Sequence, residues 1–139
     1  MKEERQEKIA WLERGKNLRL RLIGLRAEYF ERLSRSDYAG PTISDAKGGS
    51  GNGTERKFLS LAEAEQELIS IQNELDRVEM EIREAIGQVK NPLYQTYLRM
   101  RFLAYRTNQQ IAKETNYSPE HIRGKIHRNA IDALKINTK

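Results

Sequence analysis

The residues best suited to chemistry in this sequence are cations and hydrogen-bonding groups that gather in one stretch near its end. They are Lys113, Ser118, Glu120, His121, Arg123, Gly124, Lys125, His127 and Arg128. Ammonium and guanidinium groups bind phosphate, and the planar fork of arginine can donate to two acceptors on one guanine. The stretch therefore predicts contact with double-stranded DNA.

Base contacts are expected from the middle and the start of this stretch. Arg123 is the first candidate because of its fork geometry, and His121 and Glu120 follow because they lie near the start of a helix. His127 is expected on the same exposed side of that helix. These residues would face the major groove.

Phosphate contacts are expected from the remaining residues. Arg128, Lys125 and Lys113 supply positive charge, and Ser118 would both cap a helix and bind phosphate at its N-terminus. Gly124 costs a helix about 1 kcal/mol relative to alanine, so a close approach of DNA to the backbone would be a reason for its presence.

Other kinds of site lack the residues they need. With no cysteine there is no disulfide, thiolate zinc site or iron–sulfur cluster, and the two histidines, six residues apart, lie on different faces of a helix. The glycine-rich stretch 48–54 lacks the lysine of a phosphate loop. The acidic residues between 63 and 84 are expected to form a solvent-exposed face of a helix, not a pair of catalytic carboxylates. We expect no enzyme, metal or cofactor.

Two short helices joined by a tight turn are expected to carry the DNA-contacting residues. Thr107 and Gln110 form the pattern of a capping box, and Asn116 suits the left-handed conformation that ends a helix. Ser118 then provides an N-cap, with Pro119 at the first helical position. This arrangement predicts a helix-turn-helix.

A further helix, from Pro92 to near Tyr105, is expected to precede the motif. The second helix of the motif should bury its apolar side against this helix and against Ile111 and Ala112. Its apolar residues are Ile122, Ile126, Ala130, Ala133 and Leu134.

Residues 107–130 resemble region 4 of sigma-70-type factors. The resemblance lies in the pair Ile111-Ala112, the pair Asn116-Tyr117 before the capping serine, and the run Lys125-Ile126-His127-Arg128. It covers roughly residues 92–136. Sigma region 2, which melts promoters, has no counterpart, so the chain does not resemble a complete sigma factor.

The order of segments along the whole chain is similar to that of small regulators encoded by phages and prophages of Gram-positive bacteria, of the ArpU and RinA late-activator type. Both have a basic helix, a glycine-rich gap, an acidic helix and a region-4-like end. The resemblance implies DNA binding near late or packaging-gene promoters and contact with host RNA polymerase.

The net charge of +5 is unevenly distributed along the chain. Residues 1–36 carry +4, residues 37–58 carry 0, residues 59–90 carry −5 and residues 91–139 carry +6. The first and third segments can neutralise each other if they pack as two helices. The charge left to attract a polyanion then lies in the C-terminal third.

The acidic segment has the clearest periodicity, because steps of three and four residues from Leu61 to Val89 always land on apolar residues. Asn91-Pro92 should end this helix. The basic segment is a less regular helix, weakened at Gly15. Its two candidate stripes are Trp11, Leu18, Leu22, Leu25 and Tyr29, and Ile9, Leu12, Ile23, Phe30 and Leu33.

Between these helices, residues 37–57 hold five of the nine glycines, which predicts a flexible connector. A connector of this length lets the basic helix fold back antiparallel on the acidic one, and we favour this intrachain hairpin. In the alternative, the regular stripe of the acidic helix pairs with its own copy in a homodimer, although its acidic flanks would repel one another.

The sequence therefore predicts an all-α protein with a helical hairpin over residues 1–90 and a helix-turn-helix DNA-binding domain over residues 91–139. The expected function is sequence-specific transcriptional regulation in the bacterial cytoplasm, without a membrane. Three alternatives stay open: the small subunit of a phage terminase, a protein that binds RNA polymerase or a sigma factor without DNA, and an ordinary three-helix bundle.

Overall fold

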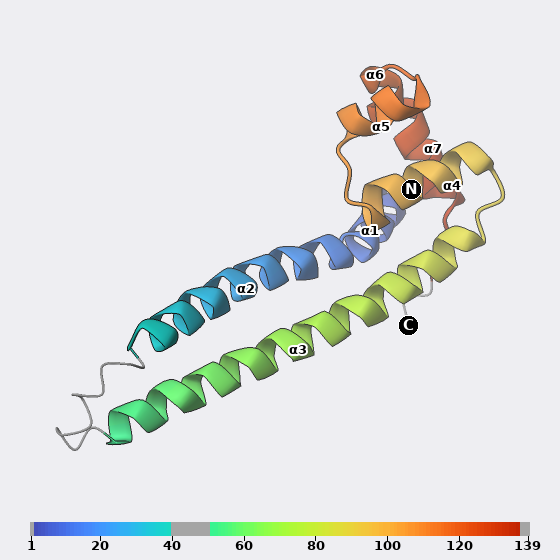
Figure 1. Ribbon diagram of the computed structural model, residues 1–139. Helices are drawn as coiled ribbons and strands as arrows, with labels where there is room; N and C mark the ends of the chain where they lie inside the picture. Colours follow the sequence, from blue (N-terminus) through green and yellow to red (C-terminus); the bar gives the residue numbers. More distant parts are fainter. Residues whose placement is uncertain (1, 40–50, 137–139) are drawn as a thin grey trace. The chain divides into compact units, whose positions relative to one another are not determined.

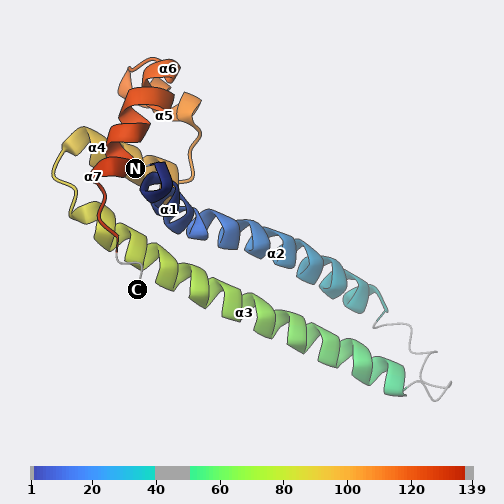
Figure 2. The same cartoon turned by 180° about the vertical axis from the view of Figure 1, so that it is seen from behind.

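The computed structural model describes residues 2–39 and 51–136, and it confirms the predicted all-α class (Figures 1 and 2). No strand occurs within these two ranges. The elements are α1 (Lys2–Leu12), α2 (Arg14–Ala39), α3 (Gly51–Gly87), α4 (Pro92–Leu98), the π-helical segment η2 (Arg99–Leu103), α5 (Asn108–Thr115), α6 (Pro119–His121), the π-helical segment η3 (Ile122–Ile126) and α7 (His127–Ala133).

The chain divides into two compact units. The hairpin unit comprises Leu18–Glu74, and the terminal unit comprises Met1–Asn17 together with Leu75–Lys139. The helix-turn-helix region thus shares its unit with α1 and with the end of α3, whereas the sequence suggested a division after residue 90. Each unit is described by itself below.

In the hairpin unit, α2 and α3 run antiparallel, as both views show (Figures 1 and 2). Leu18 and Leu22 on α2 and Ala64 and Ile71 on α3 are buried. The regular apolar stripe of the acidic helix is therefore covered within one chain in this unit, as the favoured hairpin requires.

The predicted connector was too long at both ends. α2 continues to Ala39, and α3 already begins at Gly51, so irregular structure over the whole of residues 37–57 is wrong. Once a helix has nucleated, each further residue adds a hydrogen bond, and this can outweigh the cost of about 1 kcal/mol for a glycine. Residues 40–50 lie outside the described part of the chain.

In the terminal unit, the predicted N-terminal helix is divided at Glu13 into α1 and α2. The sequence marked Gly15 as a weak point, and the structure supplies a packing reason for it. A Cβ atom at Gly15 would lie 2.9 Å from the hydroxyl oxygen of Tyr105, which donates a hydrogen bond to Glu79. Gly15 therefore gives the Tyr105 ring room to reach α3.

The core of the terminal unit is made of apolar side chains, mostly aliphatic, from α1, α3 and the C-terminal helices. Asn91 caps α4, since its side-chain oxygen accepts from the backbone N–H of Leu93 at 2.9 Å and of Tyr94 at 3.3 Å. The most deeply buried core side chains are Leu12, Ile82, Ile86, Tyr97, Leu98, Ile111, Ile122, Ile126, Ile131 and Leu134.

An ion pair joins α1 to α7. Nε and Nη2 of Arg5 donate to the two carboxylate oxygens of Asp132, each at 2.9 Å. The hydrogen bond from Arg5 lowers the pKa of Asp132 below its ordinary value. The two parallel hydrogen bonds orient α1 relative to α7. The pair is exposed, so it contributes little to the free energy of unfolding.

Two residues of α3, two positions apart, test the packing of this core. Ile82 is 0% exposed and Met80 is 67% exposed. Ile82→Ala should lower the free energy of unfolding by about 2–5 kcal/mol, because it leaves a cavity. Met80→Ala should change it by less than about 0.5 kcal/mol. Urea unfolding followed by circular dichroism measures both, and equal losses would contradict the core described here.

Candidate nucleic-acid interface

The first helix of the motif, α5, starts at a complete capping box. The backbone N–H of Gln110 donates to Oγ1 of Thr107 at 3.2 Å, and the backbone N–H of Thr107 donates to Oε1 of Gln110 at 2.9 Å. The helix ends at Asn116, whose φ of 65° is left-handed. Both features were predicted from the sequence and are confirmed.

The second helix begins at Ser118, as its sequence indicates. Oγ of Ser118 accepts from the backbone N–H of His121 at 3.1 Å, and Pro119 occupies the first helical position. From there α6, η3 and α7 follow one another without a break as far as Ala133. We call this continuous segment, Pro119–Ala133, the recognition helix.

The middle of the recognition helix is wider than an α-helix. The backbone N–H of His127 donates to the carbonyl oxygen of Ile122, five residues earlier, as well as to that of Gly124. A π-helical turn of this kind is uncommon and often occurs at functional positions. The capping and spacing signals in the sequence do not indicate it.

The buried side of the recognition helix is largely the one that was predicted. Ile122, Ile126 and Ala130 on the helix, and Leu134 directly after it, are each at most 2% exposed. Ala133, which belongs to the predicted apolar run but not to the residues expected to be buried, is exposed, and Ile131 is buried. The widened turn before α7 shifts the later residues around the helix axis, which a period of 3.6 does not anticipate.

Eight of the nine predicted DNA-contacting residues lie on the surface. They are Lys113, Ser118, Glu120, His121, Arg123, Gly124, Lys125 and Arg128. Four of them are cations and one is a carboxylate, so this set, which we call the contact surface, has a net charge of +3. The cations of the contact surface form no ion pair with any residue in the described ranges.

Gly124 lies on the contact surface in open space. A Cβ atom added there would meet nothing within 4 Å. Folding of the chain therefore does not require glycine at this position, in contrast to Gly15. Packing among the described residues therefore gives no reason for a glycine at this position.

His127 differs from the prediction, because its ring turns inward and is half-buried. Its Nδ1 lies 2.6 Å from the hydroxyl oxygen of Tyr97, which is 1% exposed. Burial, and then the nearby Arg101 guanidinium, lower the pKa of His127 below its ordinary value. Burial also raises the pKa of Tyr97 to about 12. The structure thus places the ring of His127 against the edge of the core, beside Tyr97.

Tyr117 is a surface residue that was not among the predicted DNA contacts. It lies in the turn, is 40% exposed, and stacks on His121 with ring centroids 5.5 Å apart and an interplanar angle of 24°. An exposed aromatic ring beside the start of the recognition helix adds an apolar contact to a charged surface. Its place directly before the capping Ser118 was the available signal.

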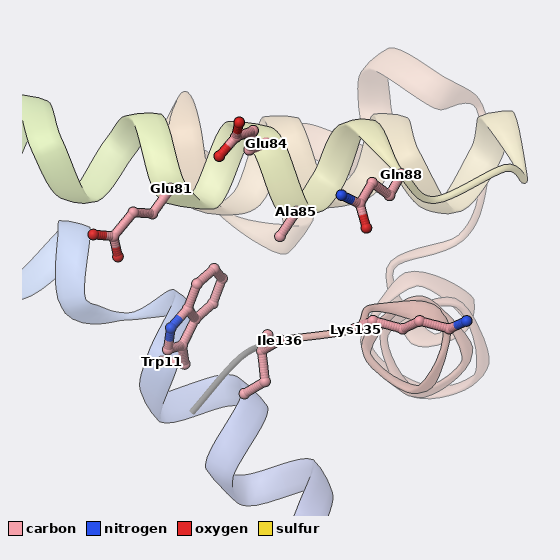
Figure 3. Close-up of a pocket in the computed structure, with 7 residues that line it drawn as sticks. All are labelled: Trp11, Glu81, Glu84, Ala85, Gln88, Lys135 and Ile136. Atoms are coloured by element: carbon pink, nitrogen blue, oxygen red, sulfur yellow. The ribbon is translucent and has the colours of Figure 1, made fainter. Parts of the chain in front are cut away.

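A hollow of about 510 Å³ lies elsewhere in the terminal unit (Figure 3). Trp11 lines it together with Glu81, Glu84 and Gln88, and the sticks in Figure 3 show the indole between α3 and Ile136. The other lining residues are Ala85, Lys135 and Ile136. Two carboxylates against one ammonium group make the hollow unfavourable for phosphate, so the contact surface remains the better nucleic-acid site.

Among residues 2–39 and 51–136, no three His, Asp or Glu side chains come together in a way that could hold a metal ion. Within the same ranges, no helix has both the length and the apolar composition that a membrane span requires.

Comparisons with protein-family models, with curated proteins and with solved structures found no match to this chain. The resemblance to sigma region 4 and to the phage regulators therefore stays a hypothesis that depends on the residues quoted above.

The half-buried His127 predicts a pH dependence of stability. Because its folded-state pKa lies below the ordinary value of 6.5, the unfolded chain binds more protons as the pH falls through 6.5. The stability that neutral His127 contributes is complete above this pH and is lost below it, with a slope of at most about 1.4 kcal/mol per pH unit. His127→Gln keeps an acceptor for Tyr97 and should flatten this slope between about pH 7 and pH 5.

His121 provides the matched control, because it is an exposed histidine of the same helix. His121→Gln makes the same chemical change at this exposed position and, in urea unfolding over the same pH range, controls for the effect of the substitution itself. If His127→Gln and His121→Gln behave alike, the half-buried Tyr97–His127 contact does not couple stability to pH.

Proposed function

We propose that the terminal unit binds double-stranded DNA through the contact surface, and that the protein is a sequence-specific transcriptional regulator. The observation that carries this proposal is the division of the recognition helix into two sides. Its aliphatic side is buried, and its other side presents Arg123, Lys125 and Arg128 to solvent. A capped helix with a free cationic side is what a major-groove reader needs.

Base recognition is assigned to the first half of the recognition helix. Arg123 would donate both arms of its fork to one guanine, and Glu120 would accept from the amino group of a cytosine. His121 and the stacked ring of Tyr117 lie beside them, where a thymine methyl group would find an apolar contact.

Phosphate binding is assigned to the residues around this centre. Lys113 lies on the first helix of the motif and Arg128 on the second, so the two would hold phosphates on either side of the base contacts. Lys125 adds a third charge, and Ser118 adds the N-terminus of the recognition helix. His127 is left out of this interface because it is half-buried against Tyr97.

The biological setting proposed here follows from the resemblance to phage regulators. The protein would act in the cytoplasm of a bacterial host, near late or packaging-gene promoters, and would contact host RNA polymerase. A terminase small subunit or a polymerase-binding protein would share the fold, and the DNA experiment below separates these roles. If the selected target is DNA from a packaging site, the protein would be a terminase small subunit. If no DNA binding occurs at low salt, the polymerase-binding role would remain.

Arg123 provides the most direct mutational test. The target is first selected from a random pool of duplexes with the full chain. Arg123→Ala should then cost about 1–3 kcal/mol of binding free energy on that target and relax the base preference at one position. Lys125→Ala should weaken all duplexes alike and reduce the slope of log affinity against log salt by about 1.

The matched control is Arg83→Ala, which removes the same charge from an exposed position on α3 in the terminal unit. It should leave base preference unchanged in a fluorescence anisotropy titration. An equal loss of specificity in Arg83→Ala and Arg123→Ala would show that the effect is one of net charge alone.

A substitution at Gly124 should have opposite effects on folding stability and on DNA affinity. Gly124→Ala should raise the free energy of unfolding by about 0.5–1 kcal/mol, because alanine favours a helix and nothing lies within 4 Å of its methyl group. The same methyl group should lower DNA affinity by keeping the backbone away from the duplex. Thermal unfolding and a DNA titration of the same variant measure the two effects.

Gly87→Ala is the control for Gly124→Ala, since an added Cβ at Gly87 on α3 also meets nothing within 4 Å. It should leave DNA affinity unchanged. Unaltered affinity in Gly124→Ala would exclude a close approach of DNA at this turn.

A further inference from the structure

The hairpin unit exposes a second apolar stripe on α2. Leu20, Ile23 and Phe30 are 58%, 51% and 62% exposed, although each has a large hydrophobic side chain. Ala27, also exposed, lies between them. The four residues follow one another at intervals of three, four and three, the spacing of a helix that packs along another helix. We call Leu20, Ile23, Ala27 and Phe30 the outer stripe.

The outer stripe faces away from the side of α2 that is buried in the hairpin. Leu18 and Leu22 are 7% and 4% exposed, and they mark the inner side of the helix. Leu20 follows Leu18 by two residues, which turns it about 200° around the helix axis. One helix thus carries two stripes on nearly opposite sides, and a two-helix hairpin can bury only one of them.

Gly24 adds an independent observation on this part of α2. It is exposed in the interior of a helix, where glycine costs about 1 kcal/mol relative to alanine, and an added Cβ there would meet nothing within 4 Å. Packing within this hairpin therefore does not require glycine here. A helix that approaches closely alongside the outer stripe would require it.

We infer that the outer stripe is covered by the outer stripe of a second copy of this chain, with the two α2 helices parallel. In this arrangement each residue of the stripe meets its own counterpart, so four apolar layers form along one seam. The large side chains Leu20, Ile23 and Phe30 lose their exposure to water, and Gly24 lies at the edge of the seam, where the helices come closest.

The charges beside the outer stripe favour a second copy over an unrelated acidic or basic helix. Arg26 and Glu31 lie on opposite flanks of the stripe and are five residues apart, the spacing that pairs two parallel helices across a seam. Arg26 would meet the partner's Glu31, and the symmetry of the pair makes this contact twice. A uniformly acidic partner would be repelled by Glu31, and a uniformly basic one by Arg26.

The contacts that Arg26 and Glu31 make within one chain do not prevent them from pairing with the second copy. Arg26 donates to Oε1 of Gln72 at 3.1 Å, and Glu31 pairs with Arg35 at 3.4 Å with both side chains more than half exposed. Exposed contacts of this kind contribute little, so replacing them costs little. A seam of four layers is short, and the dimer is therefore expected to be weak, with a dissociation constant in the micromolar range.

The test is sedimentation equilibrium of the full chain over a range of concentrations, without DNA. The wild-type chain should show a reversible equilibrium between monomer and dimer. Phe30→Glu should raise the dissociation constant at least about tenfold, because it places a carboxylate in the seam. Arg26→Glu should weaken the dimer, and the double variant Arg26→Glu, Glu31→Arg should restore it.

Ile69→Glu is the matched control. Ile69 is also an exposed apolar residue of the hairpin unit, 46% exposed, but it lies on α3. It should leave the dissociation constant unchanged while adding the same charge as Phe30→Glu. Circular dichroism of both variants checks that each remains helical.

The absence of cysteine from the sequence allows a second, structural readout. Ala27→Cys should form a disulfide-linked dimer on mild oxidation, because the two copies of position 27 face each other in the parallel pair. Ile69→Cys should stay monomeric under the same conditions. A wild-type chain that is monomeric at every concentration, or a dimer that Phe30→Glu leaves intact, would overturn the inference.

These outcomes do not depend on DNA binding. The experiments can therefore refute dimerisation through the outer stripe without refuting DNA binding by the contact surface, and the reverse. If both hold, each dimer carries two recognition helices, and its target should consist of two half-sites.

Discussion

Burial of the aliphatic side of the recognition helix is the constraint from which the proposed DNA-binding surface follows. Ile122, Ile126 and Ala130, with Leu134 directly after the helix, leave water by packing in the terminal unit, and their burial fixes the rotation of the helix. The cations between them must then point outward. The contact surface is therefore a consequence of core packing.

The local signals were readable from the sequence because they depend on residues only a few positions apart. The capping box at Thr107, the left-handed Asn116 and the cap at Ser118 are of this kind. The inward turn of His127 was not readable, since it depends on Tyr97, thirty residues away. The π-helical turn and the division at Glu13 were likewise not predicted, because apolar periodicity and capping residues carry no signal for them.

The charge pattern acquires a structural basis in the two units. The basic and the acidic helix are neighbours in the hairpin unit, so their opposite charges can offset one another at short range. The net positive charge of the C-terminal third remains. Its cations on the contact surface form no ion pairs with other described residues. Burial of one stripe of α2 leaves the outer stripe as a second feature that the monomer does not use.

Amide chemical-shift mapping of the full chain, titrated with its selected duplex, tests the central claim most directly. The account predicts that the largest shifts fall on residues 117–128, with Gly124 and Arg123 among them, and that Ile82 and Ile86 in the core of the terminal unit change little. Shifts centred on α3 or on the hollow beside Trp11, or no shifts at low salt, would contradict DNA recognition by this helix.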